Sequence, residues 1–269
     1  MNFFDNLERY TRDIAIVTES KQISYDDLIF VADDIGRQIK KRCLIFVVCK
    51  NCFESIAGYI GFMRAGAVVV MIHNTIDDAF LRNLLEVYKP EYIYLPVENP
   101  LIGTPVYAYG SYVLLKTDYE VDYTLHEDLA LLLTTSGSTG SPKFVRQSYK
   151  NINSNTKSIA QYLEITNLDR AITTMPMSYT YALSIINSHL FKGASIILTD
   201  ATLMDKRFWE TIKDKNATTF SGVPYIYEML KKLRFNQMDL PSLRYITQAG
   251  GKLGLDLSIE FADICAKKN

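Results

Sequence analysis

Short runs of apolar residues alternate along the chain with longer segments in which apolar residues recur every three or four positions. Cys43 to Val48, Ala67 to Ile72 and Leu129 to Leu133 are continuous apolar runs, the pattern of strands buried on both faces. Between the first two runs, residues 53–64 carry apolar side chains at helical spacing. Buried strands that alternate with helices predict an α/β protein whose parallel sheets are covered by helices.

The same two periods assign most of the remaining chain. Further strands are predicted at 91–95, 171–175, 193–199, 217–221 and 243–247, with a short return strand through Val145. Further helices are predicted at 1–12, 24–39, 77–88, 149–163, 204–214, 225–233 and 255–266, together with one that ends near Phe191. A hairpin is predicted at 14–23, a loop at 96–105, interrupted strand signals at 106–115, and a solvated acidic connection at 118–128.

Composition places the chain among ordinary globular proteins. A chain of 269 residues can bury about three quarters of its unfolded surface. A formal net charge of −1 gives no reason to expect nucleic acid or an anionic membrane as a partner. The longest apolar runs, at 65–72 and 129–133, are too short for a membrane span, and residues 1–12 lack the features of a signal peptide. We therefore expect a cytoplasmic protein.

The four cysteines, at positions 43, 49, 52 and 265, do not make a disulfide framework for a chain of this size. Cys49 and Cys52 nevertheless form a C-x-x-C between an apolar strand and a helix, where a thioredoxin-like redox pair would lie. A second C-x-x-C and a nearby His are both absent from the sequence, which argues against a closed zinc site.

A loop rich in Ser, Thr and Gly follows the strand at 129–133 and ends at Lys143. Gly137 and Gly140 allow successive backbone N–H groups to point into one concavity, where a phosphate can bind. Further hydroxyl donors come from Ser136, Ser138 and Thr139. Lys143 adds a positive charge, worth about 1 kcal/mol at about 4 Å from a phosphate oxygen in water and several times more in a drier cleft. The alternative is a polar surface turn, and a Walker loop is excluded because its pattern does not fit.

The order of these residues, T-S-G-S-T-G-x-P-K after an apolar strand, resembles the phosphate loop of the adenylate-forming superfamily, which comprises acyl-CoA synthetases, peptide-synthetase adenylation domains and luciferases. Phe144 departs from the pattern, since the family usually carries Gly there. The resemblance implies a catalytic role for Lys143. It assigns ATP phosphate binding to Thr135, Ser136, Gly137, Ser138, Thr139, Gly140 and Lys143.

Other segments match the family in the same order. Ser24-Tyr-Asp-Asp-Leu28 resembles the start of the family's first helix, and residues 49–72 resemble a strand–helix–strand segment in which Asn51, Glu54 and Gly66 fall on matching places. The resemblance implies a tight strand-to-helix turn at the C-x-x-C and no thiol chemistry. Cys49 and Cys52 are then most simply small, half-buried residues with a packing role.

The resemblance also indicates a substrate site. Tyr179 falls where the family has a His, and Ala182 replaces a Gly. The implied substrate pocket consists of Tyr179, Tyr181, Gly222, Val223 and Pro224, and the implied loop between acyl pocket and adenine consists of Ala249, Gly250, Gly251 and Lys252. Amino-acid-activating relatives usually place an Asp near the start of this helix, but residues 176–191 contain neither Asp nor Glu. We therefore expect a carboxylate substrate without an α-amino group.

The resemblance covers the first half of a typical family member. It implies two intertwined α/β subdomains within residues 1–269, forming an incomplete N-terminal AMP-binding core without the C-terminal domain. The implied enzyme is an ATP-dependent, AMP-forming ligase that passes its acyl group to CoA or a carrier-protein pantetheine thiol. Its Mg²⁺ ligand and the adenine-binding aromatic are expected within about 20 residues after Asn269, so this part alone is expected to be inactive. Two alternatives stay open: a non-catalytic nucleotide-binding module, and a thiol redox protein that uses Cys49 and Cys52.

Overall fold

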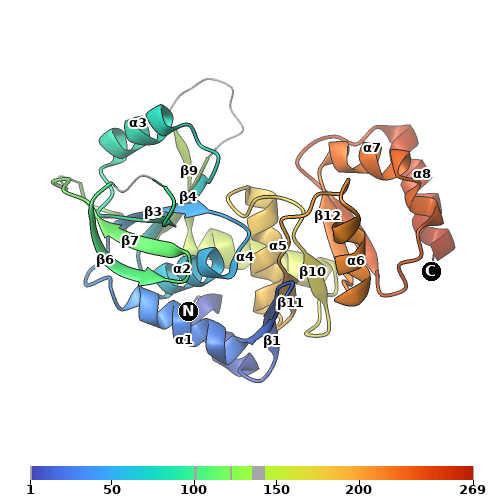
Figure 1. Ribbon diagram of the computed structural model, residues 1–269, viewed down its shortest axis with the longest axis horizontal. Coiled ribbons are helices and arrows are strands. Elements are labelled where there is room, and N and C mark those ends of the chain that lie inside the picture. The colour runs from blue at the N-terminus through green and yellow to red at the C-terminus, as the bar shows by residue number, and fades with distance from the viewer. Residues whose placement is uncertain (1, 100–101, 122, 135–142, 269) are drawn as a thin grey trace.

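The computed structural model describes residues 2–99, 102–121, 123–134 and 143–268, and in these the chain forms five layers (Figure 1). Two sheets alternate with three layers of helices. Three large buried apolar clusters fill the spaces between these layers, and a fourth cluster is small. The largest lies between the two sheets and packs on both sides of the middle helices, and the other two lie under the outer helices. The predicted α/β class is confirmed. The sheets are mixed and not purely parallel, because antiparallel strands close their edges.

The larger sheet, sheet B, has the strand order β6-β7-β5-β3-β4-β8-β9. Its strands are β3 (Leu44–Cys49), β4 (Val68–His73), β5 (Tyr92–Pro96), β6 (Thr104–Tyr109), β7 (Tyr112–Lys116), β8 (Leu129–Thr134) and β9 (Phe144–Ser148). The four central strands are parallel, as the continuous apolar runs predict. Alternate β3 residues face opposite cores, so that Val47 points to the middle of the molecule and Phe46 to the outside.

The smaller sheet, sheet A, has the order β13-β12-β10-β11-β1-β2. Its strands are β1 (Ile14–Val17), β2 (Gln22–Ser24), β10 (Arg170–Ile172), β11 (Ser195–Ile197), β12 (Thr219–Gly222) and β13 (Tyr245–Gln248). The predicted hairpin at 14–23 is confirmed, and β1 pairs in parallel with β11. The first strands of the chain therefore complete the sheet that its second half builds.

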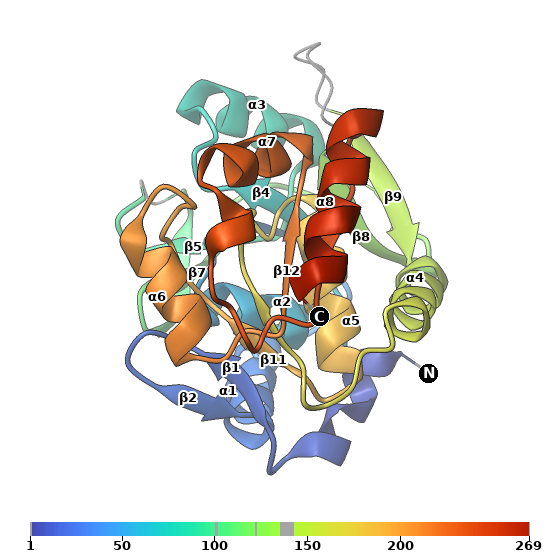
Figure 2. The ribbon, with the colours of Figure 1, turned by 90° about the vertical axis from the view of Figure 1, so that its right-hand side faces the viewer.

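Four helices form the middle layer: α1 (Tyr25–Gly36), α2 (Phe53–Arg64), α4 (Tyr149–Tyr162) and α5 (Thr180–Phe191). Helices α1 and α2 lie unusually close, because a Cβ on Gly61 would stand 2.1 Å from the carbonyl oxygen of Ala32. Helix α3 (Asp78–Tyr88) covers the outer face of sheet B. Helices α6 (Lys206–Asp214), α7 (Pro224–Lys232) and α8 (Leu255–Lys268) cover the outer face of sheet A (Figure 2).

Several predicted boundaries are wrong for local reasons. The first helix is a 3-10 helix, η1 (Phe3–Tyr10), with a capping box between Asn2 and Asp5. Helix α1 ends at Gly36, so Ile39 packs against the core from beyond the helix. The loop predicted at 96–105 already contains the start of β6. The strand predicted at 171–175 ends at Ile172.

The amino ends of the sheet A strands are joined by one buried carboxylate. Asp169, fully buried, accepts hydrogen bonds from Arg244 Nη1 at 2.5 and 2.7 Å, from Thr218 Oγ1 at 2.8 Å and from the Thr166 backbone N–H at 2.8 Å. These three residues precede β13, β12 and β10 respectively. The cluster therefore fixes the relative position of strands whose opposite, carboxyl ends carry the candidate site.

No helix in the described part of the chain is both long and apolar enough to cross a membrane.

Candidate active site

The carboxyl ends of both sheets face one another at two topological switch points. In sheet B, the chain leaves β3 toward α2 in the middle layer and leaves the neighbouring β4 toward α3 on the outer face. In sheet A, it leaves β10 toward α5 and the neighbouring β12 toward α7, again on opposite faces. Connections that diverge in this way open a crevice at the carboxyl ends of the strands, the usual ligand position in α/β proteins.

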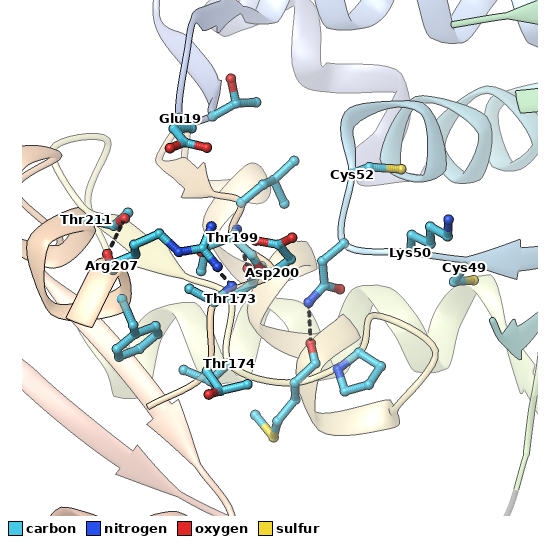
Figure 3. Close-up of a pocket in the computed structure, with 18 of the residues that line it drawn as sticks. Glu19, Cys49, Lys50, Cys52, Thr173, Thr174, Thr199, Asp200, Arg207 and Thr211 are labelled. Carbon is cyan, nitrogen blue, oxygen red and sulfur yellow. Dashed lines mark hydrogen bonds between the residues drawn. The ribbon is translucent and has the colours of Figure 1, made fainter. Parts of the chain in front are cut away.

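A cavity of about 1200 Å³ lies at this position (Figure 3). One wall comes from the ends of β10 and β11, with Thr173, Thr174 and Thr199, and the opposite wall comes from Lys50 and Cys52 before α2. Glu19 from the β1–β2 turn and Asp200 supply negative charge, while Lys50 and Arg207 supply positive charge. Lys50 is paired with Glu98, and Arg207 with Asp205 at 2.8 Å.

Asn51 joins the two sheets across this cavity. Its side-chain amide donates to the carbonyl oxygen of Met175 at 3.0 Å, and its oxygen accepts from the backbone N–H of Met177 at 3.0 Å. Both bonds hold the segment that leads directly into α5, whose N-cap is Tyr179. Asn51 therefore ties the position of the predicted pocket wall to sheet B.

The predicted pocket residues come together beside the carboxyl ends of β12 and β13. Gly250 has φ +79°, and a Cβ there would lie 2.5 Å from the Tyr179 hydroxyl and 3.1 Å from Val223 Cγ1. A Cβ on Gly251 would lie 3.1 Å from Pro224 Cγ. The loop after β13 thus lies directly over the starts of α5 and α7, and Gly250 is needed for that approach.

Tyr181 reaches the same strands from the first turn of α5. Its hydroxyl lies 2.7 Å from Thr247 Oγ1 in β13, and Thr247 Oγ1 lies 2.7 Å from Ser221 Oγ in β12. Burial raises the pKa of Tyr181, although the hydrogen bonds to Thr247 and Ser221 oppose the rise. The sequence analysis singled out neither Ser221 nor Thr247, since each is an unremarkable residue inside a predicted strand.

Gln248 directly precedes the predicted loop at 249–252 and contributes to the site as well. Its side-chain amide donates to the carbonyl oxygens of Ala249 at 3.1 Å and Gly251 at 2.8 Å, while the Ala249 N–H reaches the Gly222 carbonyl at 3.4 Å. These bonds shape the predicted loop from within. Lys252, at its far side, is exposed to solvent.

The structure describes only the two ends of the predicted phosphate loop, Thr134 and Lys143. Thr135, Ser136, Gly137, Ser138, Thr139 and Gly140 lie outside the described residues. Lys143 is exposed and directly precedes β9, which pairs with β8 so that Phe144 stands opposite Thr134. The two described ends of the loop therefore sit at the carboxyl end of β8, on the same edge of sheet B as the ends of β3 and β4.

The cavity and the predicted pocket are neighbouring features and not the same space. None of Tyr179, Tyr181, Gly222, Val223 and Pro224 lines the cavity, but Tyr225 and Ile226, which follow in α7, do. The segment 173–176 also borders it, just before the pocket wall. No residue pattern in the sequence indicated the cavity, because its walls come from both sheets.

Two further features bear on the chemistry. Burial raises the pKa values of the Cys49 and Cys52 thiols, which disfavours the thiolate that a redox role requires. Within the described residues, no group of three or more His, Cys, Asp or Glu side chains is placed to hold a metal ion.

Gly250→Ala should destabilise the protein by about 1–2 kcal/mol, because an L-residue is strained at positive φ and the methyl group would collide with the Tyr179 hydroxyl. Part of this loss of stability should be recovered when Gly250→Ala is made in the Tyr179→Phe variant, which lacks the colliding oxygen. Urea denaturation measures the free energy of unfolding of Gly250→Ala with and without Tyr179→Phe. Gly254→Ala is the matched control, since a Cβ there meets nothing within 4 Å. Equal costs at the two glycines would contradict the proposed contact.

Comparison with known proteins gives a consistent result. A family model described as "AMP-binding enzyme" matches residues 3–268. Acyl-CoA synthetase ALT10 of Alternaria alternata is 23% identical over 292 residues, covering 88% of this chain and 51% of that protein. Tyrocidine synthase 2 of Brevibacillus parabrevis is 23% identical over 261 residues, covering 92% of this chain and 7% of that protein. The chain thus spans about half of the first relative's length and much less of the second's.

Solved structures share the fold. The N-terminal domain of FACL13 from Mycobacterium tuberculosis superimposes with a TM-score of 0.79 at 18% identity, covering 97% of this chain and 73% of that one. An o-succinylbenzoate CoA synthetase from Bacillus subtilis gives a TM-score of 0.79 at 19% identity, covering 99% of this chain and 56% of that one. At these identities the likeness establishes the architecture of the two sheets and their helices.

Proposed function

Because the chain belongs to the AMP-binding enzyme family, we propose that it forms the acid- and nucleotide-binding core of an ATP-dependent, AMP-forming carboxylate ligase. One observation carries the proposal: the family match extends over residues 3–268 and so includes β8, β9 and the Ser/Thr/Gly-rich segment between them. We place the acid beside the carboxyl ends of β12 and β13. The close approach of Gly250 to Tyr179 supports this, because it brings two of the residues predicted for the acid-binding site together.

The proposed reaction has two steps. The carboxylate oxygen of the acid attacks the α-phosphorus of ATP, and the bond to the pyrophosphate oxygen breaks, giving an acyl-adenylate and pyrophosphate. A thiol, of CoA or of a carrier-protein pantetheine, then attacks the acyl carbon and AMP leaves. Negative charge redistributes over the phosphate oxygens in the first step, so fixed N–H donors and a cation are what the transition state needs. We assign these roles to residues 135–140 and to the Lys143 ammonium.

Within the described residues, no group of three or more His, Cys, Asp or Glu side chains is placed to hold a metal ion on its own. No step is assigned to Mg²⁺, and we propose, from the family resemblance, that its protein ligand lies outside residues 1–269. A cytoplasmic location belongs to the same proposal, because ATP and CoA thiols are metabolites of that compartment.

We further propose that the acid has no α-amino group. From Met175 to Lys192, the segment that leads into and forms α5, the chain contains neither Asp nor Glu to pair with an ammonium. Acid-dependent exchange of radioactive pyrophosphate into ATP, measured with the full-length protein and a panel of acids, tests both proposals. Exchange with acids that lack an amino group is the expected result. Exchange only with amino acids would refute the substrate class, and AMP binding without any exchange would favour a non-catalytic nucleotide-binding module.

A further inference from the structure

Asn51 joins the two sheets by hydrogen bonds within the crevice itself, where it also lines the cavity. Its side-chain nitrogen donates to the Met175 carbonyl oxygen and its side-chain oxygen accepts from the Met177 backbone N–H, both at 3.0 Å. A primary amide makes both bonds because it carries a donor and an acceptor, whereas a carboxylate can only accept. The contact therefore depends on the chemistry of the amide as well as on its volume.

The turn that carries Asn51 is fixed to sheet B. The backbone N–H of Lys50 donates to the hydroxyl oxygens of Ser55 at 3.0 Å and Tyr112 at 3.1 Å. The Tyr112 hydroxyl in turn donates to the carbonyl oxygen of Val48, inside β3, at 3.0 Å. Ser55 and Tyr112 are fully buried, so the turn cannot shift without breaking buried hydrogen bonds. Strand β3 pairs with β4, and β4 pairs with β8, which leads into the predicted phosphate loop.

The segment on the other side of the contact belongs to sheet A. It leads from β10 into α5 and ends at Tyr179, the N-cap of α5 and one of the residues proposed for the acid. Just before the segment, the Thr174 hydroxyl donates to the Ser221 carbonyl oxygen in β12. Within it, Met177 is 1% exposed and packs in the central core. Asn51 thus connects the acid side of the crevice to the side that carries the phosphate loop.

We infer that Asn51 is a positioning residue for adenylate formation, which sets the distance between the acid, held by elements of sheet A, and the phosphates, held at the edge of sheet B. This inference rests on the proposed function, because that proposal assigns the two substrates to different sheets. The reacting atoms must approach to about 3–3.5 Å, and a misplacement of about 1 Å can slow a reaction about 100-fold. Loss of the Asn51 amide should therefore slow the reaction without weakening the binding of either substrate.

The test compares Asn51→Ala and Asn51→Asp in the full-length protein. Exchange of radioactive pyrophosphate into ATP is measured with the acid that supports the fastest exchange in the panel, and calorimetry measures the affinity for pyrophosphate. We expect both variants to lower the maximal exchange rate about 100-fold, while the KM for the acid and the Kd for pyrophosphate change less than about 3-fold. Asn51→Asp keeps the volume of the side chain but places an oxygen against the Met175 carbonyl, so a role in packing alone would spare this variant.

Tyr25→Phe is the matched control for a loss of stability. Tyr25 is fully buried, and its hydroxyl donates to the Ala194 carbonyl oxygen at 2.7 Å. Ala194 directly precedes β11, so this contact lies at the amino end of sheet A and away from the crevice. The variant should lower the free energy of unfolding, measured by urea denaturation, but keep the maximal exchange rate of the unmodified protein.

The possible outcomes separate this inference from the proposed function. If the unmodified protein supports exchange and either Asn51 variant keeps its maximal rate, the positioning role is refuted while the adenylate-forming function stands. The role is also refuted if the variants slow exchange only through a higher KM for the acid, or if Tyr25→Phe slows exchange as much as they do. If the unmodified protein supports no exchange with any acid, the proposed function itself fails.

Discussion

Replacing Lys143 by alanine is expected to weaken binding of ATP or pyrophosphate about 10- to 100-fold, which corresponds to the loss of one charge-assisted hydrogen bond. Lys143 stands at the entry to β9, on the edge of sheet B where the parallel strands end. An ammonium there adds attraction for phosphate oxygens that backbone donors alone do not supply. Calorimetric titration with pyrophosphate at low salt measures the effect.

The salt dependence and a matched control make the Lys143 test specific. Because Lys143 is exposed, added salt should screen its contribution, and the difference between variant and parent should shrink as ionic strength rises. Lys157→Ala removes a second exposed lysine, on α4, and should leave binding unchanged. Equal affinities for Lys143→Ala and the parent at low salt would exclude a phosphate-binding role.

The central strands could be predicted from the sequence because burial on both faces leaves a simple signal. Residues 44–49 and 68–73 must be apolar on both sides, since cores lie above and below them. The sheet edges lack this constraint. Strand β6 is largely exposed, and its first two residues, 104 and 105, fall in the loop predicted at 96–105, whereas strand signals were predicted from residue 106 on. The prediction was therefore right in the sheet interior and began two residues late at the exposed edge strand.

The candidate site, too, could be predicted only in part from the sequence. The close approach of Gly250 to Tyr179 falls on residues that the family resemblance had already singled out. The contact between the Tyr181 and Thr247 hydroxyls could not be predicted from the sequence, because the two residues are separated by 66 positions and meet only through the order of strands in sheet A. The cavity between the carboxyl ends of the two sheets has the same origin, since both sheets must fold before its walls exist.

Arg244→Ala is expected to lower the free energy of unfolding by about 3 kcal/mol at neutral pH. The variant leaves the Asp169 carboxylate buried without its cation, and breaking a buried ion pair costs about 3–5 kcal/mol. The lower end applies because the Arg244 side chain is 45% exposed and its charge is partly screened. Burial alone would raise the pKa of Asp169, but hydrogen bonds from Thr166, Thr218 and Arg244 outweigh it and hold the pKa below its ordinary value.

The sign of the pH dependence follows from that lowered pKa. The ion pair stabilises the folded state fully above the unfolded pKa of about 4, and this contribution is lost as pH falls through the lower folded value. The cost of Arg244→Ala should therefore be largest near neutral pH and shrink below about pH 4. Urea denaturation between pH 3 and pH 7 measures it.

A second substitution separates the cost of an unpaired charge from a simple loss of packing. Arg244→Ala combined with Asp169→Asn removes the buried charge as well, so the double variant should be more stable than Arg244→Ala alone. Lys206→Ala, which breaks the exposed pair with Glu210, should have little effect on stability, because solvent screens a pair at the surface. If Arg244→Ala costs no more than this control, Asp169 does not hold the amino ends of β10, β12 and β13 together, and the alignment of Ser221 with Thr247 at their other ends must arise from packing alone.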